Sequence, residues 1–131
     1  MIKFILLYLS LCNCAYANSP CTQMIKSLNI TQKKQLEIDI SRQAHIEKAN
    51  ILRVFKDKDW LIMYADTYVS DETFFFYDED IYNKKTLITE WSGGAIPAEE
   101  GDIQNWVKIN AKGIPDKLTK CFSWYATFGR N

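Results

Sequence analysis

Residues 51–77, ILRVFKDKDWLIMYADTYVSDETFFFY, decide the fold. They hold three runs of β-branched and aromatic residues, 51–55, 60–69 and 73–77, separated by short polar stretches. Such runs, joined by short polar turns, predict an antiparallel meander of strands. A fourth strand is predicted at residues 86–91 (TLITEW), just before the glycine pair that marks a turn or bulge.

The run at 60–69 predicts how the sheet is covered. Successive side chains of a strand point to opposite faces. One face would therefore carry Trp60, Ile62, Tyr64, Asp66 and Tyr68, and the other Leu61, Met63, Ala65, Thr67 and Val69. The second set is smoothly apolar, whereas the first mixes aromatic residues with an acid. Either both faces are partly covered, or the first is an aromatic binding surface.

Helices are predicted on both sides of the meander. Ser19-Pro20 is typical of a helix entry and predicts a short helix at 21–28. Residues 31–49 favour a helix by length and composition, although 36–40 also alternates like a strand. The clearest helix begins near Pro97, has acids in its first turns and ends before Gly113 and Pro115.

The chain closes with an alternating stretch at 121–128, which predicts a last strand with Phe122, Trp124, Ala126 and Phe128 on one side. The order is helix, strands, helix, strand. This order predicts an α+β fold: a small antiparallel sheet of about four to five strands, with helices packed on one face and one disulfide.

Residues 1–17 are predicted to be a signal peptide. Lys3 provides a positive start, residues 4–11 a short apolar run, and Ala15 and Ala17 a small-x-small cleavage site. The apolar run is shorter than a membrane span requires, although an uncleaved anchor is the alternative. We therefore expect residues 18–131 to form a single exported domain, in the periplasm or outside the cell, with no membrane span after signal cleavage.

Cleavage changes the cysteine count. Cys12 and Cys14 would leave with the signal, and Cys21 and Cys121 would remain in an oxidising compartment, where a single pairing is possible. The alternative, two free thiols with a redox or metal role, lacks C-x-x-C spacing and a nearby histidine. We predict a structural Cys21–Cys121 disulfide.

Composition excludes several classes of function. Lys and Arg number 16, as do Asp and Glu, so the chain lacks the basic excess of a general nucleic-acid binder. His45 is the only histidine. A catalytic base there would need a partner that no recognisable motif supplies, and a helix-surface role is the simpler interpretation. We expect no metal and no cofactor, because soft ligands are too few for a zinc site.

The charges are unevenly distributed along the chain. Residues 18–56 carry seven basic and three acidic side chains, residues 57–103 three and twelve, and residues 104–131 five and one. An acidic centre rich in aromatics suits a cationic protein partner, and Asp78, Glu79 and Asp80 are the candidate contact residues. The alternative is that these acids merely protect loops and strand edges from aggregation.

Two functions follow from these features. The first is a non-catalytic periplasmic or extracellular binding protein of the inhibitor or immunity type, with a basic protein as partner. The second is a small carboxylate-dependent hydrolase of cell-envelope glycans, which would use acids such as Asp66, Glu90, Glu99 or Glu100. Two carboxylates facing each other in an aromatic cleft would favour the second function.

Overall fold

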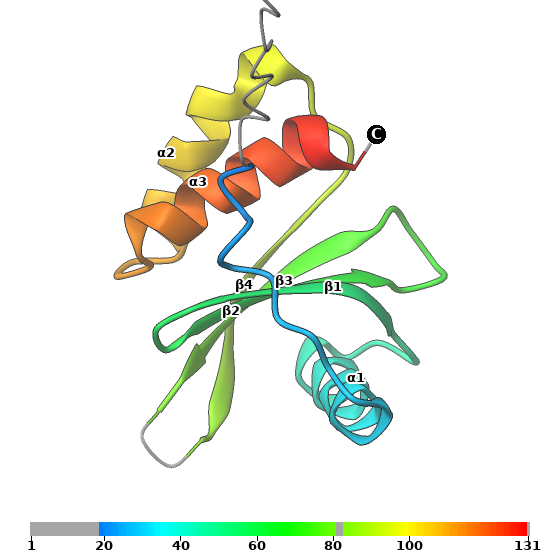
Figure 1. The fold of residues 1–131 in the computed structure, drawn as a ribbon. Helices are drawn as coiled ribbons and strands as arrows, with labels where there is room; N and C mark the ends of the chain where they lie inside the picture. The colour runs from blue at the N-terminus through cyan, green and yellow to red at the C-terminus, as the bar shows by residue number, and fades with distance from the viewer. Residues whose placement is uncertain (1–18, 81–82, 131) are drawn as a thin grey trace, which may run out of the picture.

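The computed structural model describes residues 19–80 and 83–130 (Figure 1). The predicted signal peptide, residues 1–17, lies outside the described residues. A twisted sheet lies in the middle, with helices packed on each of its two faces (Figure 1).

The sheet is the predicted antiparallel meander. Its strands are β1 (Asn50–Asp57), β2 (Trp60–Asp66), β3 (Thr73–Glu79) and β4 (Lys85–Ser92), in the spatial order β1-β2-β3-β4. β2 ends three residues before the predicted run does. There the Asp66 carboxylate accepts a hydrogen bond from the Tyr68 backbone N–H (2.8 Å), and Tyr68 has a positive φ of 65°. This turn chemistry ends the strand.

Both faces of the sheet are covered, as one of the two readings of β2 requires. Trp60, Ile62 and Tyr64 belong to one core, whereas Leu61, Met63 and Ala65 belong to the other. The alternating side chains of β2 and β3 therefore contribute to two hydrophobic cores, one on each face of the sheet.

Helix α1 (Ile30–Ala44) covers the face that carries Leu61 and Met63. It begins at Asn29, whose side chain accepts a hydrogen bond from the Gln32 backbone N–H (2.8 Å), and Gln32 returns a bond to the Asn29 backbone. Leu36 and Ile40 form its buried stripe. The helix prediction is confirmed, but the helix ends at Ala44 because exposed His45 takes a left-handed conformation (φ 55°).

The opposite face is covered by the C-terminal part of the chain. The elements are η1 (Pro97–Glu99), α2 (Glu100–Asn110), α3 (Asp116–Trp124) and the π-helical turn η2 (Tyr125–Gly129). The helix predicted from Pro97 is confirmed, with Ile103 and Val107 buried.

The predicted strand at 121–128 is wrong, because this segment is helical. Leu118, Cys121, Phe122 and Tyr125 recur at helical spacing and contribute to the core beneath the helix. Phe122 packs edge-on against Phe74 and Phe76 of β3, with ring centroids 4.8 and 4.9 Å apart. Phe128, which the alternating pattern placed beside Phe122, is exposed.

The α+β class and the antiparallel sheet are confirmed, but the helices do not share one face. β2 and β3 are apolar on both sides, so a single helical layer would leave one apolar face in water. Helix α1 covers one face, and α2 and α3 cover the other (Figure 1).

The predicted helix at 21–28 is also wrong. Turns occupy its first half, and residues 24–26 then pair with the edge of β1. The Lys26 N–H donates to the Val54 carbonyl (2.8 Å), and the Lys56 N–H donates to the Met24 carbonyl (2.7 Å). Strand-edge hydrogen bonds outweigh the helical preference of so short a segment.

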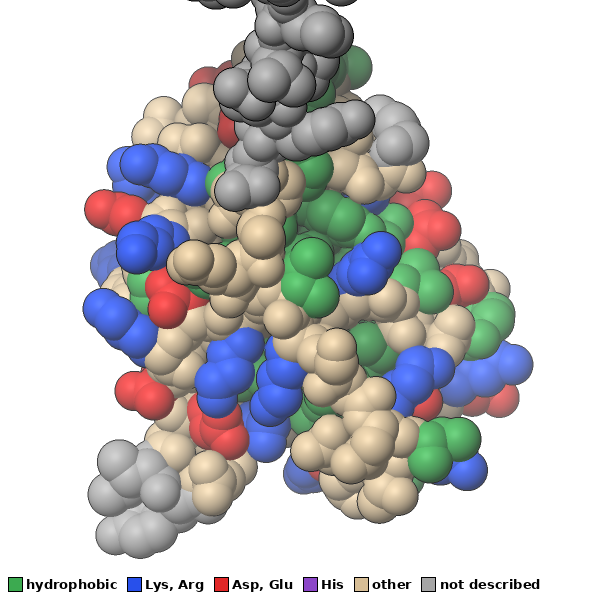
Figure 2. All heavy atoms as spheres, viewed as in Figure 1, with side chains coloured by type: hydrophobic (Ala, Val, Ile, Leu, Met, Phe, Trp, Pro, Cys, Tyr) green, Lys and Arg blue, Asp and Glu red, His purple; other side chains and the backbone are tan. Residues whose placement is uncertain are grey.

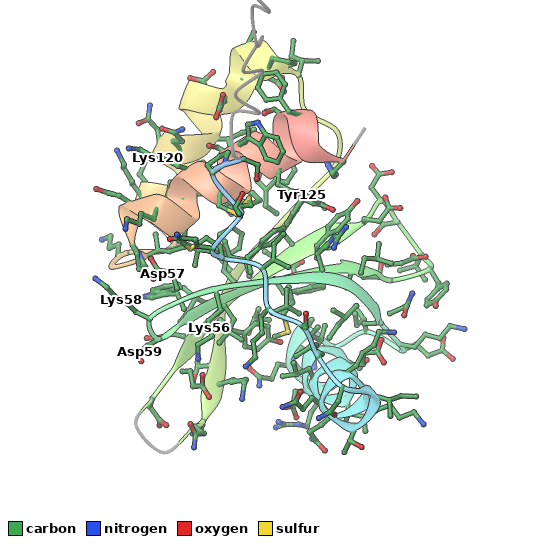
Figure 3. All side chains as sticks on the ribbon, viewed as in Figure 1. Lys56, Asp57, Lys58, Asp59, Lys120 and Tyr125 are labelled. Atoms are coloured by element: carbon green, nitrogen blue, oxygen red, sulfur yellow. A yellow bond between two sulfur atoms is a disulfide. The ribbon has the colours of Figure 1, made fainter. Side chains whose placement is uncertain are left out.

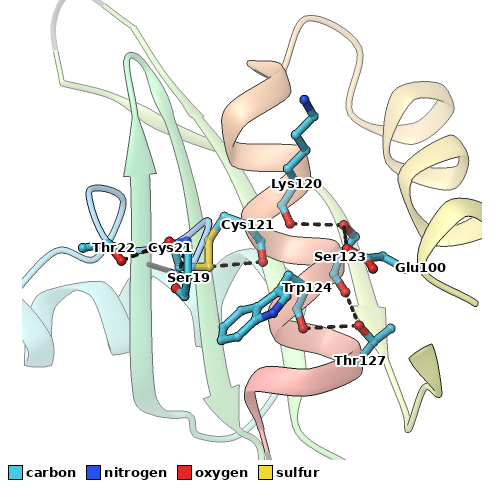
Figure 4. Close-up of a disulfide and its surroundings, with 9 residues drawn as sticks. All are labelled: Ser19, Cys21, Thr22, Glu100, Lys120, Cys121, Ser123, Trp124 and Thr127. Carbon is cyan, nitrogen blue, oxygen red and sulfur yellow. Dashed lines mark hydrogen bonds between the residues drawn. A yellow bond between two sulfur atoms is a disulfide. The ribbon is translucent and has the colours of Figure 1, made fainter. Parts of the chain in front are cut away.

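The predicted disulfide is present between Cys21 and Cys121 (Figure 4). It fastens the N-terminal segment to the middle of α3, with the two Cα atoms 4.6 Å apart. Both cysteines are buried, at 1% and 0% exposed. The disulfide therefore belongs to the hydrophobic core between α3 and the sheet.

Both edge strands are irregular and receive side chains from α1. β1 has a bulge at Leu52 and β4 has one at Ile88. Gln43 bonds the β4 backbone at the Leu87 N–H (2.9 Å) and the Lys85 carbonyl (3.1 Å). Glu37 accepts a bond from the Ile51 N–H of β1 (2.8 Å). These bonds occupy edge groups that could otherwise pair with another chain.

Candidate partner-binding surface

The three predicted contact acids lie at the end of β3, but they do not act together. Asp78 and Glu79 are consecutive in a strand, so their side chains point to opposite faces of the sheet. Asp78 is exposed on the face that carries Trp60, with which it pairs across the strands. Glu79 lies on the face of α1.

Glu79 is neutralised by neighbouring lysines. Its carboxylate oxygens lie 3.3 Å from the Nζ atoms of Lys56 and Lys85, and its side chain is only 13% exposed. Partial burial favours the neutral acid, but the charges and hydrogen bonds of the two lysines outweigh it and hold the pKa of Glu79 below its ordinary value. Little of its charge is left for a partner.

Asp80 helps to build the connection between β3 and β4. Its carboxylate accepts a hydrogen bond from the Lys84 N–H (2.9 Å), and its own N–H donates to the Lys84 carbonyl (3.0 Å). The Asn83 N–H donates to the Asp80 carbonyl (3.0 Å). Asp80 is exposed all the same, so its charge still contributes to the local field.

The meander brings two further carboxylates to this end of the sheet. Asp57 pairs with Trp60, which in turn pairs with Asp78, so both acids belong to the same face on either side of Trp60. Asp59 lies in the turn between β1 and β2, and its carbonyl accepts a bond from the Glu79 N–H (2.7 Å). Figure 3 labels Asp57 and Asp59 at this turn. We call Asp57, Asp59, Asp78 and Asp80 the acidic end.

Sequence reasoning missed Asp57 and Asp59, which it treated only as turn residues. A signal was available: once 51–55, 60–69 and 73–77 are paired as antiparallel neighbours, the 56–59 turn and the end of the third strand must meet. The acids of residues 57–103 are otherwise dispersed. Asp66, Asp71 and Glu72 lie at the opposite end of the sheet, and Glu99, Glu100 and Asp102 at the start of α2.

The acids considered for glycan hydrolysis lie on separate elements. Asp66 ends β2, and Glu90 lies on β4, with β3 between them. Glu99 accepts a bond from the Ile96 N–H (3.0 Å) at the start of the helical layer. Glu100 accepts one from the buried Ser123 hydroxyl (3.3 Å), as Figure 4 shows. Helix-start and helix-packing roles account for this last pair.

Ranges 19–80 and 83–130 contain no group of three His, Cys, Asp or Glu side chains arranged to hold a metal ion. Within those ranges, none of the helices is both long and apolar enough to cross a membrane. Asn29, the first residue of an N-x-T sequon, is exposed and caps α1.

Comparison of the chain with protein-family models, curated proteins and solved structures finds no match.

Proposed function

We propose that this chain is an exported, non-catalytic binding protein of the inhibitor or immunity type, which meets a basic protein partner through its acidic end. The observation that carries the proposal is the convergence of Asp57, Asp59, Asp78 and Asp80 at one end of a sheet that has a core on each face. Destination in the periplasm or outside the cell is part of the proposal, supported by the signal-like residues 1–17 and by the disulfide.

The acidic end has the physical character that such an interface requires. Strand pairing holds the backbone of Asp57 and Asp78, so little backbone entropy is lost when a partner binds. Trp60 lies between Asp57 and Asp78 and is almost fully buried (8% exposed), which places a rigid aromatic support under the charges. Fixed negative charge accelerates encounter with a cationic surface and sets its register.

The test is capture from the native exported fraction with two matched baits. The first is the double variant Asp57→Asn and Asp78→Asn, which removes two charges from the acidic end. The second is Asp71→Asn and Glu72→Gln, which removes two charges from the opposite end of the sheet. We expect the unaltered chain and the second bait to retain the same basic protein, and the first bait to bind it at least about tenfold more weakly.

The affinity for that partner should also fall as salt is raised, because exposed charges beyond about 10 Å are screened at ~0.1 M salt. A captured partner with a neutral or acidic contact face, or equal losses in both baits, would contradict the proposal.

A further inference from the structure

A pocket of about 320 Å³ opens between the first half of α1 and the sheet. Its size is at the lower limit of small-molecule sites. Leu28, Leu36 and Leu61 give it an apolar floor, and the last two are buried. The remaining lining residues are polar: Lys26, Thr31, Gln32, Gln35, Asp39 and Lys85.

The rim of the pocket is positively charged. Lys26 comes from the segment that pairs with β1, and its ammonium group has no hydrogen bond or ion pair with any described residue. Lys85 comes from β4 and shares Glu79 with Lys56, so two lysines face one carboxylate there. In Figure 2 basic side chains gather beside the hollow between the β3–β4 hairpin and α1, where Figure 3 labels Lys56.

The one acid in the lining is already paired. The Asp39 carboxylate accepts a hydrogen bond from the Gln35 side chain (3.2 Å) and lies 3.6 Å from the Arg42 guanidinium. It therefore does not cancel the charge of Lys26. The pocket combines an apolar floor, neutral amides and an excess of ammonium groups.

We propose that this pocket binds a small amphipathic carboxylate. The hydrocarbon part would lie on the leucine floor, and the carboxylate would lie between Lys26 and Lys85. A wholly polar anion would leave the floor in water, and a cation would meet the unpaired ammonium group of Lys26. This proposal does not depend on the basic protein partner, because the acidic end and the pocket are made of different residues.

The first experiment is a ¹H–¹⁵N NMR titration of the disulfide-bonded protein with octanoate, and with acetate and octanol as controls. Octanoate should shift the amide signals of Leu28, Leu36, Leu61 and Lys85. Acetate lacks the tail and octanol lacks the charge, so each should bind at least about tenfold more weakly, the equivalent of one lost charge-assisted or apolar contact.

Three variants locate the site. Lys26→Ala removes the unpaired ammonium group and should weaken octanoate binding about tenfold. Gln35→Trp places a large ring at the exposed edge of the pocket and should abolish binding. Lys108→Ala, on α2 in the other helical layer, should change nothing. Circular dichroism and urea midpoints establish that each variant is folded.

The proposal is overturned if octanol binds as well as octanoate, if acetate does, or if Lys26→Ala and Gln35→Trp leave the octanoate affinity unchanged in folded protein. Binding to phosphatidylcholine vesicles doped with oleate, without any response to soluble octanoate, would also overturn it. That result would assign the lysines to a lipid surface.

Discussion

Tyr77 brings an unpaired hydroxyl group into the core. It is completely buried in β3, and its hydroxyl has no hydrogen-bond partner among the described residues. Burial, assisted by the negative charge of Asp39, raises its pKa well above the ordinary value for a tyrosine. An unpaired buried hydroxyl costs on the order of 1–3 kcal/mol of folding free energy.

Replacing Tyr77 with Phe should therefore stabilise the protein by about 1 kcal/mol, measured as a higher urea midpoint. Tyr64→Phe is the control, because among the described residues the Tyr64 hydroxyl is not a buried group without a partner, so the same change there should bring no such gain in stability. A less stable Tyr77→Phe protein would mean that water or another group satisfies the hydroxyl.

Glu79 makes stability depend on pH in a defined direction. Its folded-state pKa is lowered, because the two lysines outweigh the effect of partial burial. The ion pairs therefore stabilise the protein above the pKa of the unfolded chain, and this contribution is lost as pH falls through the lower, folded value. Glu79→Gln should cost about 0.5–1 kcal/mol at pH 7 and almost nothing at about pH 2. Urea unfolding at both pH values measures it, and an unchanged difference would contradict this account.

The strands were easier to predict from the sequence than the last helix was. The strands of residues 51–77 alternate or run continuously apolar between polar turns, and the meander follows from neighbouring strands pairing in order. Residues 121–128 carry aromatic residues at two-residue and four-residue spacings together, so the pattern alone did not separate strand from helix. Tertiary contacts favour the helix, because the helical segment packs Phe122 against the aromatic rings of β3.

Two glycines in the helical layer test that packing. A methyl group at Gly129 would lie 2.6 Å from Tyr125 Cδ2 and 2.8 Å from Trp124 Cζ3, so Gly129→Ala should destabilise the protein by about 1–3 kcal/mol. A methyl group at Gly101, in the first turn of α2, meets nothing within 4 Å.

Gly101→Ala should therefore stabilise the protein by about 0.5–1 kcal/mol, because alanine loses less backbone freedom in a helix. Thermal unfolding of the pair measures both effects. The two changes in unfolding free energy need not be equal in size. A stabilising Gly129→Ala would show that η2 is packed differently.

The charge counted along the sequence did not predict where the acidic side chains gather on the surface of the molecule. Residues 57–103 hold twelve acids, yet the meander sends most of them to the two ends of the sheet and to the start of α2. Asp78 could be singled out from sequence. That Asp57 lies near Asp78 depends on the strand register. That Lys56 and Lys85 form ion pairs with Glu79 depends on contacts across the sheet.

The disulfide should contribute strongly to stability, because it joins residues 100 positions apart. The chain-entropy model gives on the order of 4–5 kcal/mol for such a loop, an upper value that strain can reduce. The variant Cys21→Ala with Cys121→Ala should lose a large part of this, measured by urea unfolding. Unaltered protein in reductant should behave alike. No loss in either sample would show that sheet and helices need no covalent tie.

The position of Cys121 also fixes the order of events when the chain is made. All four strands, α1 and α2 precede Cys121 in the chain, so the bond cannot form until they have been synthesised. The strands pair with their sequence neighbours through hairpins, which close short loops and form quickly. The meander therefore does not need the bond to set its register. Refolding of the full chain in reductant is expected to restore the paired strands without any covalent link.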